Sequence, residues 1–152
     1  MKNSLLFAFF VLCFHSLTFA QAVWHDDFTK AHELAKQEKK LLLLNFTGSD
    51  WCGWCKKMKA DVLLKKEFLE YAAKNVVLVD VDFPEYKEQT ASVKKTNQTL
   101  KQKYGASGYP TFVLIDAGGT ELGRHIGYSQ GGPAKFIAML DRFRQSASPT
   151  TK

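Results

Sequence analysis

Residues 41–58 have the sequence LLLLNFTGSDWCGWCKKM, and the rest of the chain can be interpreted outward from it. The apolar run at 41–46 is typical of a strand buried on both faces, as in a parallel or mixed sheet covered by helices. After a turn at 47–50, a helix over 56–66 is predicted to open at the cysteines. Because the Cys-x-x-Cys spacing brings both sulfurs close enough to bridge at a helix start, it indicates a redox motif.

The chemistry of the pair depends on how readily Cys52, the sulfur expected to be exposed, loses its proton. A free cysteine has a pKa of about 8.5 and is mostly protonated at neutral pH, whereas the N–H groups at a helix start favour an anion. Gly53 and Trp54, between the cysteines, carry neither a charge nor an imidazole that would stabilise the thiolate further. Since a very stable thiolate would make the disulfide a strong oxidant, the pair is predicted to be reducing or isomerising.

Other uses of the cysteine pair stay open. A purely structural disulfide would close a loop of two residues and remove little chain entropy. Zinc would need two further ligands, and His25, His32 and His125 lack the spacing of a common zinc site. Copper(I) is a stronger alternative, because Met58 extends the pair into a Cys-x-x-Cys-x-x-Met series of soft ligands. Met58 also falls on the apolar side of the predicted helix, which favours a core position, so neither a metal nor a bound cofactor is expected.

The flanking sequence predicts further helices and strands. A first helix is predicted over 24–40, with Asp26 and Asp27 as candidate N-caps, and a second buried strand over 76–82. A segment at 68–73 extends the cysteine helix or forms another. A polar stretch at 85–97 is followed by a helix at 98–104, hairpin strands at 111–115 and 121–126, and a final helix at 133–143. This order predicts an α/β fold, with a central mixed β-sheet flanked by helices on both faces.

Length and composition limit the class of protein. The chain has 152 residues, 45% of them hydrophobic and 24% charged, which suits one sizeable core and excludes a chain of several domains. Its 13% aromatic residues, 10 Gly and 4 Pro exclude the collagen-like and disordered classes. The net charge of +6 favours solubility and indicates no particular partner.

The first residues have the layout of a secretory signal peptide. Lys2 precedes an apolar run at 5–14, and small residues then offer cleavage after Ala20 or Ala22. The run is shorter than the roughly 20 residues that cross a bilayer, which disfavours an uncleaved anchor. Cys13 would leave with the signal, so the exported protein would keep two cysteines in an oxidising compartment. We therefore expect a signal peptide at 1–20, one domain at 23–145 and a disordered tail at 146–152.

A set of short motifs surrounds and follows the cysteine pair. They are Trp51-Cys52-Gly53-Trp54-Cys55-Lys56, Gly108-Tyr109-Pro110-Thr111-Phe112, Gly118-Gly119 and Gly127-Tyr128. Together they resemble the thioredoxin superfamily, and most closely its secreted bacterial thiol:disulfide interchange proteins. The resemblance covers about residues 24–143 and implies a thioredoxin fold. It also implies that Cys52 attacks a substrate disulfide and that Cys55 resolves the mixed disulfide.

The resemblance implies a substrate-binding role for four further residues. Pro110 would follow a cis peptide bond and face the cysteines, and Tyr109 would offer its backbone to an extended substrate segment. Trp51 would pack beside the sulfurs and shape the docking surface. Trp54 would be exposed and contact partners. The segment at 83–98 is absent from minimal thioredoxins, so the resemblance implies no role for it.

The chain also departs from the family pattern. Asn45 stands on the strand before the motif, where many thioredoxins have a buried acid, and one extra residue precedes the motif. An amide cannot accept the proton of the Cys55 thiol as a carboxylate can, so water or another group must do so. Asp50 is a candidate, although a loop or cap role is the simpler interpretation. Asp80 and Asp82 alternate onto one face of a strand end and are expected to be solvated.

These observations predict an exported thiol:disulfide oxidoreductase that reduces or isomerises protein disulfides in the periplasm or outside the cell. Its partners would be protein disulfide substrates and a membrane-embedded thiol reductant as electron donor. No nucleic-acid partner is expected, and the protein is expected to be a monomer. The alternative is a thioredoxin-fold binding protein or a copper(I) carrier without redox catalysis.

Overall fold

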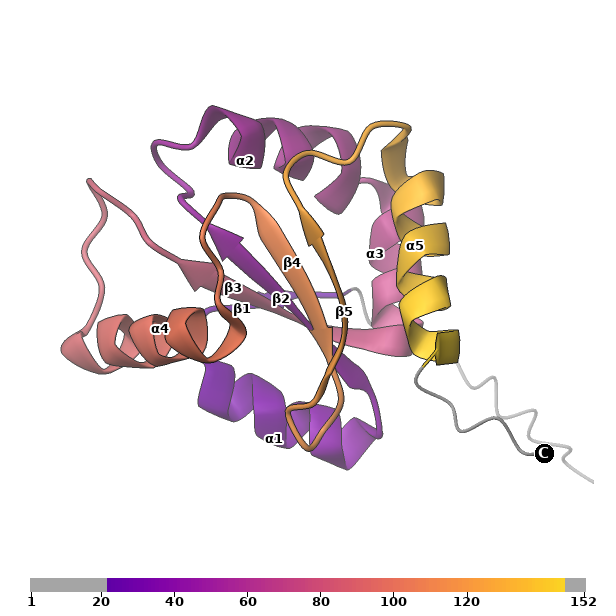
Figure 1. Cartoon of the computed structure of the whole chain (residues 1–152), viewed down its shortest axis with the longest axis horizontal. Coiled ribbons are helices and arrows are strands. Elements are labelled where there is room, and N and C mark those ends of the chain that lie inside the picture. The colour runs from indigo at the N-terminus through magenta and orange to yellow at the C-terminus, as the bar shows by residue number, and fades with distance from the viewer. Residues whose placement is uncertain (1–21, 147–152) are drawn as a thin grey trace, which may run out of the picture.

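A mixed β-sheet of five strands forms the centre of the protein (Figure 1). The computed structural model describes residues 22–146, so the predicted signal peptide and nearly all of the predicted tail lie outside the described residues. The strands are β1 (Trp24–His25), β2 (Leu41–Thr47), β3 (Val76–Asp82), β4 (Thr111–Ile115) and β5 (Glu121–Ile126), in the spatial order β1-β3-β2-β4-β5. The pairs β1·β3 and β2·β3 are parallel, whereas β2·β4 and β4·β5 are antiparallel.

Helices cover both faces of this sheet (Figure 1). They are α1 (Phe28–Glu38), α2 (Gly53–Met58), the π-helical turn η1 (Lys59–Leu63), α3 (Lys66–Asn75), α4 (Ala91–Tyr104) and α5 (Gly132–Ser146). Buried side chains of α1 and α4 share one hydrophobic core with the sheet. Buried side chains of α2, η1, α3 and α5 share the core on the opposite face. The predicted fold class is confirmed.

Alternation along β2 decides which side chains meet which helices. Leu42 and Leu44 belong to the core under α1 and α4, whereas Leu43 belongs to the core under α2 and α3. Successive strand residues point to opposite faces, so Asn45 shares the face of Leu43. The amide of Asn45 is therefore directed toward the layer that contains the cysteine pair.

The structure corrects three predicted element boundaries. Residues 24–25 form β1 and not the start of a helix, because the helix begins only after Asp27, whose side chain accepts the N–H of Lys30. The cysteine helix begins at Gly53 and ends with η1 at Leu63, not at residue 66, and α3 is the separate helix that the sequence had left open as an alternative. Helix α4 begins at Ala91, so the polar stretch predicted as a loop is half helical. Its Thr90 cap accepts the N–H of Val93.

None of the helices within residues 22–146 is long and apolar enough to cross a membrane.

Candidate active site

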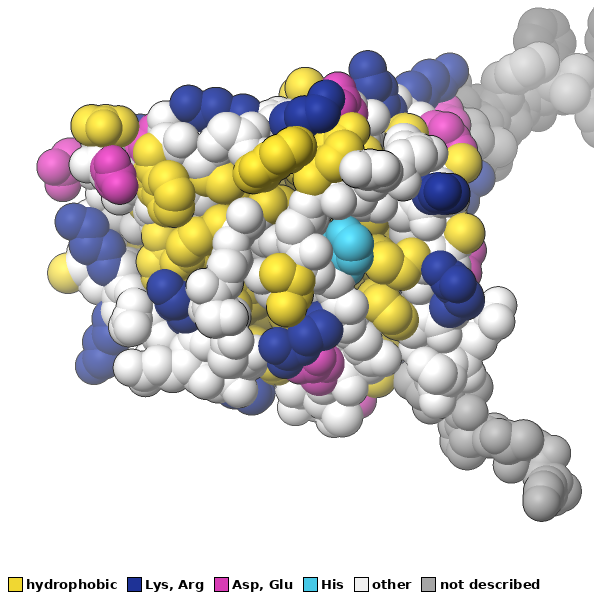
Figure 2. Space-filling model, turned by 45° about the horizontal axis from the view of Figure 1, so that its top comes forward, with side chains coloured by type: hydrophobic (Ala, Val, Ile, Leu, Met, Phe, Trp, Pro, Cys, Tyr) yellow, Lys and Arg dark blue, Asp and Glu magenta, His cyan; other side chains and the backbone are white. Residues whose placement is uncertain are grey.

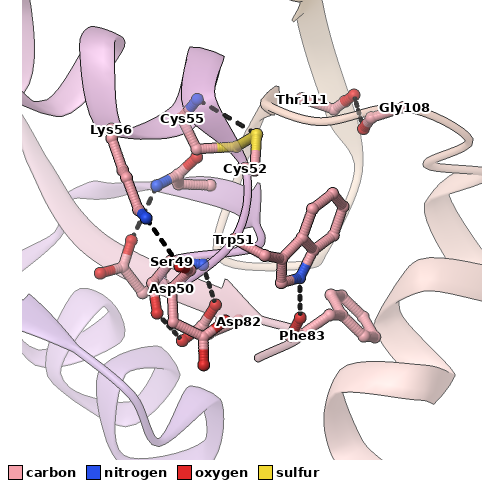
Figure 3. Close-up of a disulfide and its surroundings, with 12 residues drawn as sticks. Ser49, Asp50, Trp51, Cys52, Cys55, Lys56, Asp82, Phe83, Gly108 and Thr111 are labelled. Carbon is pink, nitrogen blue, oxygen red and sulfur yellow. Dashed lines mark hydrogen bonds between the residues drawn. A yellow bond between two sulfur atoms is a disulfide. The ribbon is translucent and has the colours of Figure 1, made fainter. Parts of the chain in front are cut away.

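The two cysteines form a disulfide at the start of α2 (Figure 3). Their Cα atoms are 5.2 Å apart. Cys52 occupies the N-cap position, and its Sγ accepts the backbone N–H of Cys55 at 3.1 Å. Because a hydrogen bond to the charged form of a group favours that form, this N–H would also stabilise a thiolate on Cys52.

Burial does not distinguish the two cysteines in the disulfide form. Cys52 is 6% exposed and Cys55 is 5% exposed, so the prediction that the first cysteine is the openly exposed one is wrong for this state. The turn that carries Cys52 is folded back, since its N–H donates to the carbonyl of Gly48 at 2.9 Å. The residues differ in position: Cys52 precedes the helix, whereas Cys55 lies inside it and lines a partly open cavity.

The cavity beside Cys55 has a volume of about 30 Å³. Asn45 of β2, Asp80 of β3 and Lys59 of η1 also line it. Asn45 and Asp80 are directly paired in the parallel register of the two strands, and Asn45 Nδ2 donates to Asp80 Oδ1 at 2.8 Å. The cavity therefore joins the second cysteine to a carboxylate on a neighbouring strand.

The prediction that Asp80 and Asp82 are solvated is wrong. Both side chains are only partly exposed, because β3 lies between β1 and β2 and its end is covered by the turn at residues 48–51. Asp82 accepts the N–H of Ser49 at 2.8 Å and its hydroxyl at 2.6 Å (Figure 3). Burial raises the pKa of Asp80 to about 6, against the lowering effects of Asn45 and Lys59.

Trp51 lies on the surface beside the disulfide and is held there by the chain after β3. It is 39% exposed, and its Nε1 donates to the carbonyl of Phe83 at 2.8 Å (Figure 3). Its ring meets that of Tyr109 edge-on at 5.6 Å, and Tyr109 also contacts the ring of Phe83 at 5.7 Å. Trp51 is therefore no core residue, and it joins the cysteine loop to the segment before β4.

Trp54 lies on α2, between the two cysteines in the sequence. It is 60% exposed, as predicted, and its ring lies 5.7 Å from that of Tyr128. The hydroxyl of Tyr128 donates to Asp61 at 2.8 Å, and Lys57 Nζ lies 2.7 Å from the same carboxylate oxygen. The contact between Trp54 and Tyr128 was not predicted, because it arises only when the loop after β5 packs against α2 and η1 in the fold.

The peptide bond between Tyr109 and Pro110 is cis, which confirms the expectation from the resemblance. Pro110 is buried, and its carbonyl accepts the N–H of Gly127 at 2.7 Å. The loop with Gly108 and Thr111 lies across from Cys52 in Figure 3. Tyr109 precedes the first residue of β4 and lies outside the ladder between β4 and β5.

Asp50 fastens the segment after β3 to the cysteine loop. Its Oδ1 accepts the N–H of Glu85 at 3.0 Å, and its Oδ2 accepts those of Tyr86 at 2.8 Å and Lys87 at 3.0 Å. Burial would raise the pKa of Asp50, but these N–H groups outweigh it and lower the pKa below its ordinary value. Asp50 is thus the loop acid that the simpler interpretation predicted, and its oxygens are occupied away from Cys55.

Replacing Asp50 by Ala is expected to release residues 85–87. Three backbone N–H groups lose their acceptor together, so their amide hydrogen exchange should accelerate by roughly tenfold. Exchange measured residue by residue by NMR checks this. Asp116→Ala is the matched control, since Asp116 accepts the N–H groups of Gly118 and Thr120 in the hairpin. Equal protection of residues 85–87 in both variants would contradict the assignment.

The observations bear on the metal alternatives as well. Met58 is fully buried in the core under α2 and α3, which agrees with the core interpretation of its side chain. Within residues 22–146, no group of three or more His, Cys, Asp or Glu residues is placed to hold a metal ion.

Figure 2 turns the top of Figure 1, where α2 lies, toward the viewer. Hydrophobic side chains gather in a band across this face, and charged side chains of both signs lie around its edges. The end of the molecule that carries the disulfide therefore offers an apolar surface bordered by charged side chains.

Comparison with known proteins agrees with this geometry. A sequence profile of the thioredoxin-like domain family matches residues 28–144. The disulfide bond reductase DsbH of Chlamydia pneumoniae is 40% identical over 115 residues, which are 76% of this chain and 69% of the relative. The thioredoxin-related protein DsbJ of the same organism is 31% identical over 133 residues, which are 84% of this chain and 38% of the relative.

A solved structure of a DsbH oxidoreductase has a TM-score of 0.77 and 37% sequence identity, and the match covers 83% of this chain and 86% of that chain. The profile match spans both cysteines, Asp80 and Pro110. The chain belongs to the thioredoxin-like domain family.

Proposed function

We propose that this thiol:disulfide oxidoreductase reduces or isomerises disulfides of exported proteins. The observation that carries the proposal is the bridged pair at the start of α2, with the Sγ of Cys52 as acceptor of the N–H of Cys55. The name of the DsbH relative, a disulfide bond reductase, supports the reducing direction. Cys52 is the nucleophile and Cys55 the resolving thiol.

The first chemical step belongs to Cys52. In the reduced protein its thiolate attacks one sulfur of a substrate disulfide, so a new bond joins the two proteins while the substrate disulfide breaks. The departing substrate sulfur leaves as a thiolate. The N–H of Cys55 stabilises the Cys52 thiolate without any charged neighbour between the cysteines, so the thiolate is moderately stable and the pair remains a reductant.

Four residues around the disulfide form the proposed docking surface. Trp51 and Trp54, which are close to Cys52 in the sequence, supply exposed aromatic area. Tyr109 and Pro110 come before β4, where an extended substrate segment can add to the backbone next to the cysteines. Sequence-tolerant main-chain contacts of this kind suit an enzyme that acts on many unfolded or partly folded clients.

The location and the electron donor are also part of the proposal. The N-terminal pattern supports export by a signal peptide, and a thiol pair in an oxidising compartment needs a source of electrons. We therefore assign the donor to a membrane-embedded dithiol reductant, and the working form to a monomer that needs no bound cofactor.

The reduction potential of the cysteine pair tests the proposal. Equilibration of the protein with glutathione mixtures at neutral pH is expected to give a potential near about −270 mV, in the range of reducing thioredoxins. Alkylation followed by mass spectrometry reports the oxidised fraction, and the Cys52→Ser/Cys55→Ser variant serves as the control that shows no transition. A value near about −120 mV, typical of strong oxidants, would overturn the reducing direction.

A further inference from the structure

The environment of Cys55 contains one carboxylate that the proposed mechanism has not used. Asp80 lies at the end of β3 on the face covered by α2, and it lines the same cavity as Cys55. Its partner across the strands is Asn45, which donates its Nδ2 hydrogen to Asp80 Oδ1 at 2.8 Å. The amide thus holds the carboxylate at the cavity wall through Oδ1, and Asp80 Oδ2 takes no part in this hydrogen bond.

The cavity has the size and polarity to hold water. Its volume of about 30 Å³ exceeds the 10–15 Å³ or so that one water molecule requires. Asn45 is buried, and within residues 22–146 its Oδ1 has no hydrogen-bond partner. A buried amide oxygen without a partner is costly, so it marks a position where a water molecule would be bound.

The other nearby carboxylates are already engaged. Both oxygens of Asp50 accept backbone N–H groups of the segment after β3. Both oxygens of Asp82 accept hydrogen bonds from Ser49. Neither of these acids lines the cavity beside Cys55, whereas Asp80 does.

We propose that Asp80 accepts, through a water molecule in this cavity, the proton that Cys55 loses when its sulfur attacks the mixed disulfide. The inference rests on the proposed function of the cysteine pair and deepens it. The acid that accepts the Cys55 proton would then lie on β3, because β2 has Asn45 where a carboxylate would be needed.

The step balances as follows. The Cys55 thiol gives its proton to the water, which passes a proton to the Asp80 carboxylate, and the sulfur attacks the Sγ of Cys52. A disulfide forms between Cys52 and Cys55, the bond between Cys52 and the substrate sulfur breaks, and the substrate leaves as a thiolate. The substrate gains two electrons and the cysteine pair loses two, which the dithiol donor later restores.

Several charged groups surround Asp80 and set the pH range of this step. Lys59 of η1 and Lys87 of the segment after β3 lower its pKa, whereas burial and the Asp82 carboxylate raise it. Lys56 of α2 also lines the cavity. The balance puts the pKa of Asp80 at about 6, so the carboxylate is ionised and able to accept a proton at neutral pH.

The test compares three variants in a single turnover. The reduced protein is mixed with a disulfide peptide that lacks histidine, samples are quenched in acid, and mass spectrometry follows the mixed disulfide on Cys52. Asp80→Asn should slow the decay of the mixed disulfide on the order of 10²-fold at neutral pH, while its formation stays unchanged. The double variant Asn45→Asp/Asp80→Asn, which moves the carboxylate to β2, should recover most of the rate. Asp27→Asn, which keeps a good N-cap on α1, is the control and should match the wild type.

The pH dependence separates proton transfer from a structural effect. The wild-type decay rate should rise with pH and level off above about 6, and this inflection should be missing from Asp80→Asn. The role of Asp80 would be overturned if Asp80→Asn decayed within twofold of the wild-type rate or kept the inflection. It would also be overturned if the double variant Asn45→Asp/Asp80→Asn were as slow as Asp80→Asn alone. A wild-type protein that forms no mixed disulfide would instead overturn the proposed function.

Discussion

Replacing Cys52 by Ser is expected to reduce disulfide exchange to the background rate in buffer. A hydroxyl is no nucleophile toward a disulfide near neutral pH, and the neighbouring Cys55 lies inside α2 rather than at its N-cap. Turnover of a disulfide-linked peptide with a dithiol as electron donor, followed by chromatography, measures the loss. A variant that keeps turnover above background would show that Cys52 is not the nucleophile.

Replacing Cys55 by Ser is expected to trap the mixed disulfide between Cys52 and the substrate. The first exchange proceeds, but no second thiol releases the substrate, so mixed disulfides through Cys52 accumulate with exported proteins. Non-reducing electrophoresis and mass spectrometry identify these adducts, and the Cys52→Ser/Cys55→Ser variant is the matched control that captures none. Absence of adducts together with tight copper(I) binding would favour the carrier alternative.

Replacing Asp80 by Asn is expected to stabilise the oxidised protein at neutral and alkaline pH. The pKa of Asp80 is about 6 in the folded protein and 3.8 for an ordinary Asp, so the folded state binds more protons at this site between these values. Ionisation of Asp80 therefore weakens the folded state as the pH rises, by up to roughly 3 kcal/mol. The amide removes this cost while its oxygen can still accept the hydrogen bond from Asn45.

Urea unfolding of the oxidised protein at several pH values checks this result. The gain in the free energy of unfolding should be largest at about pH 8, shrink as the pH falls through 6, and vanish below about pH 4. Asp27→Asn again provides the control, since its carboxylate lies at the start of α1 and its pKa is lowered mainly by the backbone N–H of Lys30. A constant difference between Asp80→Asn and wild type at every pH would contradict the explanation by ionisation.

The sequence was sufficient to predict most of the sheet. The strands β3, β4 and β5 have the predicted bounds, because each is an apolar or alternating run between clear turn signals. β1 was missed because a strand of two residues is too short to show a period. The first half of α4 was missed because, of the residues from Ala91 to Asn97, only Asn97 is buried, so an apolar stripe is absent there.

The site was predictable where local spacing decides it and not where strand pairing does. The cysteine pair follows from the Cys-x-x-Cys spacing, whereas the exposed Trp54 and the cis bond before Pro110 were expected from the family resemblance. The proximity of Asp80 to Cys55 depends on which strands are neighbours and on their register, which pairs Asn45 with Asp80. Alternation did place Asp80 on one face of its strand, but the sequence does not show what covers that face.

The attachment of residues 85–87 to Asp50 constrains Asp50 but leaves the side chains at residues 85–87 free to vary. The carboxylate holds only main-chain N–H groups, so the hydrogen bonds do not depend on which side chains stand at these positions. Tyr86 directs its side chain outward at 79% exposure. The side chains at residues 85–87 can therefore vary without disturbing the cysteine loop, provided that Asp50 and the length of the segment are retained.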